Sequence, residues 1–204
     1  MKPVLTDDGS MTFYSSEFSE CYHSKSGALQ EAFEKYIKPC KIKDGMVVLD
    51  VCFGLGYNSL AALYTAKNLK IIGLEKDINI LKQKVDMPSY LEKDYSKIIE
   101  ASKNLKYKDD AVEIKILVGD ALQTIDTVNE NFDAVFFDPF SPKKCPELWA
   151  LDFFKKIRSK MKKGGILATY SCARNVRDNL RQAGFEVKDG PCIGRRSPST
   201  VAFA

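Results

Sequence analysis

Residues 132–142 read FDAVFFDPFSP, an apolar run that ends in a carboxylate and a proline-rich turn. Every position from Ala134 to Phe137 is apolar, which predicts a strand buried on both faces of a parallel sheet. Ligands of open parallel sheets bind beyond the carboxyl ends of the strands, and Asp138 stands at such an end. Pro139 and Pro142 fix φ and remove two amide donors, so a stiff turn is expected to present Asp138.

Asp138 admits two interpretations. It either faces a ligand, or it caps the helix that is expected to begin at Pro146. Eight residues separate the two positions, which is too many for a cap. The sequence therefore favours a ligand-facing carboxylate.

The composition predicts one ordinary globular domain. The chain has 204 residues, of which 45% are hydrophobic and 28% charged. No apolar run approaches the roughly 20 residues that span a bilayer, and the N-terminus lacks the apolar core of a signal peptide. We expect a cytoplasmic protein that does not contact the membrane. Its six scattered cysteines include no C-x-x-C pair, which favours reduced thiols and no metal site.

Charge is distributed unevenly along the chain. From Lys143 to the end there are 14 basic and 5 acidic residues, whereas the first 142 residues hold 17 and 22. Such a split is typical of a nucleic-acid surface, although solvated helix faces are often equally rich in lysine.

Residues 1–45 are interpreted as an N-terminal helical extension of a domain that occupies residues 46–204. A helix is expected over 27–37, capped by Ser26 and ended by Pro39, with Leu29, Phe33, Tyr36 and Ile37 at helical spacing. His23, the only histidine, lies in a polar loop, where it is more often incidental than catalytic.

A strand, a glycine-rich turn, a helix and a second strand follow in order. The strand 46–52 leads into Phe53-Gly54-Leu55-Gly56, then a helix over 60–67 and a strand over 70–74 that ends in Glu75. Glycines let a ligand approach the backbone, and an acid nineteen residues after Gly56 can accept both hydroxyls of a ribose. Ser59 replaces the third glycine of the dinucleotide motif. This favours a nucleoside without a pyrophosphate, such as S-adenosylmethionine.

A third strand over 113–118 ends at Gly119-Asp120-Ala121. Asp120 is placed to accept from an adenine amino group or to cap a helix over 121–128, and the two roles are compatible. The alternation predicts an α/β fold with a doubly wound, mostly parallel seven-stranded sheet. The remaining expected elements are helices over 77–85, 88–108, 146–161 and 174–183 and strands over 166–170, 185–188 and 200–203.

With these pieces placed, the chain resembles the class I, Rossmann-like S-adenosylmethionine-dependent methyltransferases. More narrowly, it resembles the methyltransferase part of the tRNA 5-methylaminomethyl-2-thiouridine biosynthesis proteins. The residues that carry this resemblance are Phe53-Gly54-Leu55-Gly56-Tyr57-Asn58, Gly119-Asp120-Ala121, the run from Phe137 to Lys143, Pro146 to Trp149, and Arg195-Arg196. The family usually has glycine where this chain has Pro139 and asparagine where it has Cys145.

The resemblance implies a stand-alone methyltransferase without the oxidase domain, dependent on another enzyme for its substrate. That substrate would be the amine of 5-aminomethyl(-2-thio)uridine at the wobble position of the tRNA anticodon loop. Asp138 would orient the amine, and Phe140 would either stack on the base or fill the core. The implied cofactor contacts are Phe53, Gly54, Gly56, Asn58, Glu75, Asp120, Ala121 and Asp138. The implied tRNA contacts are Lys143, Lys144, Arg174, Arg177, Arg195 and Arg196.

Two other classes of function remain open at this point. One is a small-molecule amine methyl- or aminopropyltransferase of the spermidine-synthase type, which needs an acidic pocket for a polycation. The basic C-terminal region argues against it. The other is a non-catalytic nucleotide- or RNA-binding module, and the presence of both Glu75 and Asp138 argues against that.

Overall fold

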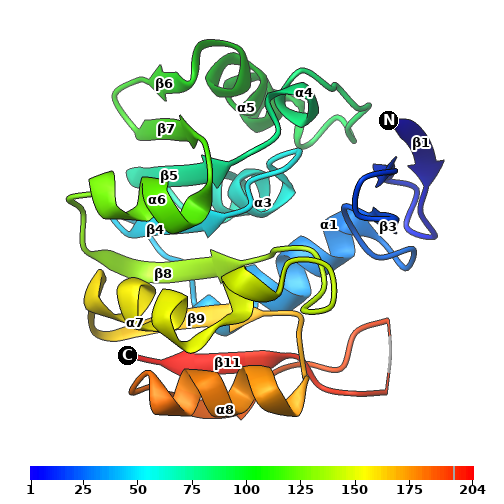
Figure 1. Cartoon of the computed structure of the whole chain (residues 1–204). Helices are drawn as coiled ribbons and strands as arrows, with labels where there is room; N and C mark the ends of the chain where they lie inside the picture. The colour runs from blue at the N-terminus through cyan, green and yellow to red at the C-terminus, as the bar shows by residue number, and fades with distance from the viewer. Residues whose placement is uncertain (195) are drawn as a thin grey trace.

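The computed structural model describes residues 1–194 and 196–204. Its centre is an eight-stranded sheet in the order β10-β11-β9-β8-β4-β5-β7-β6, in which β4, β5, β7, β8 and β9 are parallel (Figure 1). The strands are β4 Val47–Val51, β5 Leu69–Glu75, β6 Lys106–Lys108, β7 Val112–Val118, β8 Phe132–Phe137, β9 Met161–Thr169, β10 Glu186–Asp189 and β11 Thr200–Phe203. The expected doubly wound α/β sheet is confirmed. It has one strand more than expected, because β6 pairs antiparallel with β7 where a helix end was predicted.

Neighbouring residues of each central strand enter two separate cores. Phe136 packs in the layer that contains Tyr36, Leu60 and Ile98, while Phe137 packs in the layer on the opposite face. The first layer holds α3 Tyr57–Thr65 and α5 Glu92–Asn104, and the second holds α6 Ala121–Thr124, α7 Leu151–Ser159 and α8 Arg174–Gln182. This is why β8 is apolar at consecutive positions.

The N-terminal residues form a small antiparallel sheet that the sequence did not predict. It consists of β1 Lys2–Leu5, β2 Met11–Ser15 and β3 Glu20–Cys21. Figure 1 shows this sheet beyond the carboxyl ends of the parallel strands. Phe13 of β2 is buried in the same core as Val48 of β4. We propose that residues 1–45 form an extension packed on the domain of residues 46–204.

The helix expected over 27–37 is built differently from the prediction. It runs as α1 Ala28–Glu31, the π-helix η1 Ala32–Ile37 and α2 Lys38–Cys40. Ser26 does not cap it, since Gly27 is the N-cap residue without a side-chain bond. Pro39 does not end it, because a proline is tolerated in the first turn of α2. The helix ends at Lys41, which has φ of 53°.

Other helices are shorter than expected. The helix expected over 146–161 is divided into the 3₁₀-helix η3 Pro146–Trp149 and α7 by the extended residue Ala150, and Gly164 and Gly165 lie inside β9. Over 77–85 only α4 Ile78–Leu81 forms, and over 121–128 α6 is followed by the 3₁₀-helix η2 Ile125–Thr127. No helix within the described part of the chain is long and apolar enough to cross a membrane.

Candidate active site

A cleft of about 680 Å³ lies at the edge of the sheet where the parallel strands end. Its walls come from the turn after β4, from the ends of β5, β7 and β8, and from residues that follow β2. The cleft brings together six of the residues that the sequence analysis proposed: Gly54, Glu75, Asp120, Ala121, Asp138 and Phe140.

The glycine-rich turn after β4 is shaped by packing from behind. Cys52, Gly54 and Gly56 have φ of 65°, 57° and 78°. A Cβ atom on Gly56 would lie 2.7 Å from the Ile98 side chain and 2.9 Å from the Phe53 ring, so only glycine fits there. Phe53 is itself buried in the core. Phe53 and Gly56 therefore hold the turn in place without lining the cleft, whereas Gly54 lines it.

Glu75 is held at the end of β5 by two backbone amides. Gly54 N–H donates to its Oε2 at 2.8 Å and Asp77 N–H to its Oε1 at 2.8 Å. Burial raises the pKa of this carboxyl above its usual range. Each carboxylate oxygen retains a further acceptor site. Glu75 can therefore accept two hydroxyls of a ligand in the cleft.

Asp120 combines the two roles that its position allowed. Its Oδ1 accepts from Leu122 N–H at 2.9 Å, so it caps α6, and the residue also lines the cleft. One carboxylate oxygen stays available to a ligand.

Asp138 lies just past β8, where its N–H donates to Val51 O at 3.2 Å. The Tyr36 hydroxyl donates to Oδ1 at 2.5 Å, and the Asn58 amide donates to Oδ2 at 3.0 Å. Burial, reinforced by the charge of Glu31, raises the pKa of Asp138 well above its ordinary value. Asp138 caps no helix, since Cys145 is the N-cap residue of η3. The chain thus positions a half-buried carboxylate with a raised proton affinity in the cleft.

The turn that follows Asp138 is fixed from two sides. Trp149 Nε1–H donates to Phe140 O at 2.8 Å, and the Tyr170 hydroxyl donates to Pro139 O at 3.0 Å. The Phe140 ring stacks on Phe18 with centroids 4.3 Å apart and meets the edge of Tyr22 at 4.9 Å. Phe140 is therefore both a wall of the cleft and a packed side chain.

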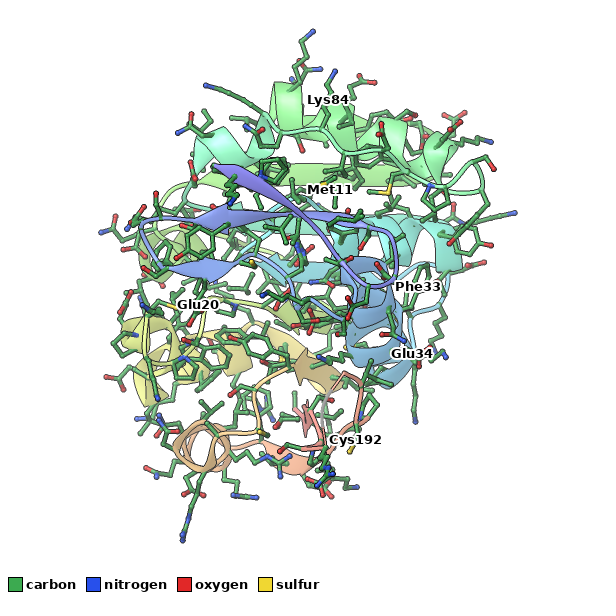
Figure 2. All side chains as sticks on the ribbon, turned by 90° about the vertical axis from the view of Figure 1, so that its right-hand side faces the viewer. Met11, Glu20, Phe33, Glu34, Lys84 and Cys192 are labelled. Carbon is green, nitrogen blue, oxygen red and sulfur yellow. The ribbon has the colours of Figure 1, made fainter. Side chains whose placement is uncertain are left out.

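Residues 17–26, here named the roof segment, cross over the cleft. Glu20 accepts from Ser141 N–H at 3.0 Å and from Ser141 Oγ at 2.5 Å, while the Tyr22 hydroxyl donates to Asp77 Oδ2 at 3.2 Å. These contacts join the turn after β8 to the end of β5. Figure 2, which looks onto this edge, shows Glu20 on the N-terminal strands in front of the sheet. Phe18, Glu20 and Tyr22 are residues of the site that were not predicted from the sequence.

His23, for which the sequence favoured an incidental over a catalytic role, lines the cleft. Burial lowers its pKa to about 4, so the imidazole is neutral at pH 7. Its Nδ1 lies 3.0 Å from Thr12 Oγ1, and its ring meets Tyr57 edge-on at 4.9 Å. These contacts anchor the roof segment to β2 and α3.

Of the basic residues proposed for tRNA, those that the structure describes lie outside the cleft. Lys143, Lys144, Arg174 and Arg196 are exposed, and Arg195 lies outside the described residues. The guanidinium of Arg177 donates to Thr200 Oγ1, Asp189 Oδ1 and Ser199 O, so it already ties α8 to the end of the sheet. Among the residues that the structure describes, no group of His, Cys, Asp and Glu is arranged to hold a metal ion.

Comparison with known proteins identifies the family. A family model described as S-adenosyl-L-methionine-dependent methyltransferase matches residues 82–204. The chain belongs to this family. Its cofactor is S-adenosylmethionine, and the cleft with Glu75 at the end of β5 fits a nucleoside of this kind. The crystal structure of MNMC2 from Aquifex aeolicus shares 35% identity and a TM-score of 0.90, over 98% of this chain and 69% of that one.

Curated relatives are longer than this methyltransferase. An uncharacterized protein of Methanocaldococcus jannaschii is 38% identical over 98% of this chain and 58% of its own length. The tRNA 5-methylaminomethyl-2-thiouridine biosynthesis bifunctional protein MnmC of Leptospira interrogans is 25% identical over 95% of this chain and 34% of its own. The chain therefore spans a third to somewhat over half of these relatives. A spermidine synthase with 13% identity and a TM-score of 0.61 shares the fold alone.

The substitution Glu75→Ala tests the proposed ribose contact. We expect S-adenosylmethionine binding to weaken by about 1–3 kcal/mol, because two hydrogen bonds to the ribose are lost. Isothermal titration calorimetry on the folded variant measures this directly. Glu92→Ala, an exposed acid at the start of α5, serves as the control and should bind normally. Unchanged affinity in Glu75→Ala would remove Glu75 from the site.

Proposed function

We propose that this methyltransferase moves the methyl group of S-adenosylmethionine to the amine of 5-aminomethyl(-2-thio)uridine at the wobble position of a tRNA. The observation that carries the proposal is the carboxylate of Asp138, held by Tyr36 and Asn58 in a cleft beside the glycine turn. The family membership and the names of the MnmC relatives support it.

Gly54, Glu75, Asp120 and Ala121 are proposed to hold the adenosine part of the cofactor. They line the cleft in the order of the strands, with Asp120 after β7, Glu75 at the end of β5 and Gly54 after β4. Asn58 acts on the cofactor site indirectly, because its amide is used to hold Asp138.

The chemistry assigned to Asp138 follows from its environment. S-adenosylmethionine supplies an electrophilic methyl group on a sulfonium. A free alkylamine has a pKa near that of lysine, about 10.4, and is mostly protonated and not nucleophilic at neutral pH. Asp138 attracts this ammonium, and its raised pKa makes it a better acceptor of the ammonium proton. Tyr36 and Asn58 fix the carboxylate so that the freed lone pair is held in one direction.

The wobble base of the proposed tRNA substrate must unstack from its neighbouring bases to reach the cleft. Single-stranded loop bases are commonly splayed out and stacked on aromatic side chains. Phe140 lines the cleft with one face covered by Phe18, so a base would meet its remaining exposed surface. An upstream enzyme that installs the aminomethyl group is required by this substrate.

Exposed basic residues after Lys143 are proposed to contact the tRNA backbone. A Lys143→Ala, Lys144→Ala, Arg174→Ala triple variant should bind tRNA more weakly, and the slope of log affinity against log salt should fall by roughly 1 per lost contact. Filter binding at several salt concentrations measures the slope. The control triple Lys103→Ala, Lys106→Ala, Lys108→Ala makes the same charge change on α5 and on the edge strand β6, which are not part of the proposed surface. Equal effects from the two triples would contradict the proposed surface.

A second function is favoured by the charge of the cleft. Eight acidic side chains line it, against three lysines. An acidic cleft suits a small polyamine, as a methyl- or aminopropyltransferase of small amines would need. Incubation with labelled S-adenosylmethionine and either tRNA carrying the aminomethyl group, tRNA lacking it, or polyamines separates the two functions. Label in the modified uridine alone supports the tRNA function, and label in a polyamine alone supports the alternative.

A further inference from the structure

A buried ion pair at the wall of the cleft is not used by the chemistry described above. Lys35 and Glu31, one turn apart on η1 and α1, have side chains only 4% and 8% exposed, with Nζ 2.5 Å from Oε1. Both residues line the cleft. Glu31 is anchored in turn, because its Oε2 accepts from Ser24 N–H of the roof segment at 3.1 Å.

Lys35 has donor capacity left for a ligand. Its ammonium carries three hydrogens, and Glu31 is its one hydrogen-bond acceptor among the described residues. A buried charge is stabilised only when it is paired and hydrogen-bonded. An anion bound in the cleft would therefore stabilise Lys35, because it would accept hydrogen bonds from the remaining N–H groups of the ammonium.

We propose that Lys35 binds the α-carboxylate of S-adenosylmethionine and that Glu31 holds the Lys35 ammonium in place for it. This inference rests on the proposed positions of the adenosine at Glu75 and of the reacting end at Asp138. It does not depend on the methyl acceptor.

The position of Lys35 agrees with the order of groups along the cofactor. The strand order places Asp120, Glu75, the Gly54 turn and Asp138 in sequence along the edge of the sheet. Lys35 directly precedes Tyr36, whose hydroxyl binds Asp138, and η1 packs against β9 on the far side of β8. An amino-acid chain that continues past the sulfonium from the ribose would therefore run toward the wall of the cleft that Lys35 lines.

Among the lysines that line the cleft, Lys35 is the one best suited to bind an anion, because its charge is buried. The α-carboxylate is the one anionic group of S-adenosylmethionine, and the charged residues that line the cleft are mostly acids, which would repel it. Lys25 and Lys76 also line the cleft, but both are exposed, so their attraction to an anion is weakened by water and salt. Lys35 is buried, so neither water nor salt weakens its attraction to an anion in this way.

Comparison of S-adenosylmethionine with decarboxylated S-adenosylmethionine tests the proposal, because the two differ only in that carboxylate. In Lys35→Met, calorimetry should show the Kd for S-adenosylmethionine rising about 10- to 100-fold, through loss of a charged hydrogen bond. The Kd for the decarboxylated compound should rise by less than about threefold or fall, because its ammonium no longer faces a lysine. Lys25→Met, the control, should change both constants by less than about twofold.

Loss of Lys35 also leaves Glu31 buried without its partner, which can destabilise the fold. The double variant Lys35→Met, Glu31→Gln removes both charges, and its melting temperature shows whether it is folded. The folded double variant should discriminate between the two cofactors less than the parent protein does. Equal weakening of both compounds, or no weakening of either, overturns the assignment of Lys35. Glu75→Ala weakens both compounds alike, so failure of the adenosine placement is distinguishable from failure of the Lys35 contact.

Discussion

Asp138→Ala should lower the single-turnover rate of methyl transfer by about 10²-fold or more, equivalent to at least ~2.7 kcal/mol of transition-state stabilisation. The carboxylate is expected to attract the substrate ammonium, take its proton and orient the lone pair. S-adenosylmethionine affinity should change little, since Glu75, Asp120 and the glycine turn remain. Rapid-quench kinetics with the aminomethyl tRNA and calorimetry with the cofactor measure the two quantities.

Asp138→Asn separates charge from shape. The amide keeps one oxygen to accept from Tyr36, but its NH₂ group then faces the Asn58 amide that donates to the native carboxylate. We therefore expect Asp138→Asn to transfer the methyl group as slowly as Asp138→Ala does, and to melt at a slightly lower temperature than the parent protein. Asp152→Ala, on the exposed first turn of α7, is the control and should react at the normal rate. A normal single-turnover rate in Asp138→Ala would show that Asp138 is not a catalytic residue.

Phe137→Ala should destabilise the fold by about 3–5 kcal/mol. Phe137 is fully buried and its ring contacts Trp149, Phe153 and Phe154, at centroid distances of 5.0, 6.0 and 5.1 Å. Removal of the ring leaves a cavity between β8 and α7 directly beneath the Asp138 turn. For a chain of this length the melting temperature should fall by roughly 6–20 °C.

The matched control for this prediction is Phe137→Leu, which keeps most of the apolar volume and should cost less than about 1.5 kcal/mol. Chemical denaturation followed by circular dichroism gives both free energies of unfolding. A loss below about 1 kcal/mol in Phe137→Ala would show that the layer closes around the missing ring, contrary to the packing argument.

The sequence predicted those parts of the structure that depend on residues close together in the chain. The apolar run Ala134–Phe137 predicted β8, because a strand buried on both faces must be apolar at every position. The acids Glu75, Asp120 and Asp138 were predicted together because each follows a parallel strand, and parallel strands end at the same edge. All three line the cleft.

The parts that were missed depend on contacts between distant residues. Glu20 binds Ser141 across 121 positions, and no local pattern predicts such a pairing. Tyr36 was expected only as one of several apolar side chains on a helix. It is indeed buried, but its hydroxyl reaches Asp138 102 positions away. A buried tyrosine usually finds a partner for its hydroxyl, which is the signal that was available.

Helix lengths were overestimated for a different reason. Residues 146–161 contain a continuous helical pattern, yet Ala150 is extended and separates η3 from α7. This break lets Trp149 turn its indole N–H toward Phe140 O. A tertiary hydrogen bond thus overrides a local propensity, which is weak for helices of this length.

The π-helix η1 makes chain length as important as residue identity in this part of the protein. Its bonds join residues five apart, as Lys38 N–H to Phe33 O does, so it holds an additional residue compared with an α-helix. Deletion of one residue between 32 and 37 would restore regular α-helical spacing and turn the preceding segment by about 100° relative to Tyr36. Glu31 would then leave the wall of the cleft, and the roof segment would lose one of its anchors, the bond from Ser24 N–H to Glu31. Relatives that share this cleft should therefore keep the number of residues between Glu31 and Tyr36 even where the residues themselves differ.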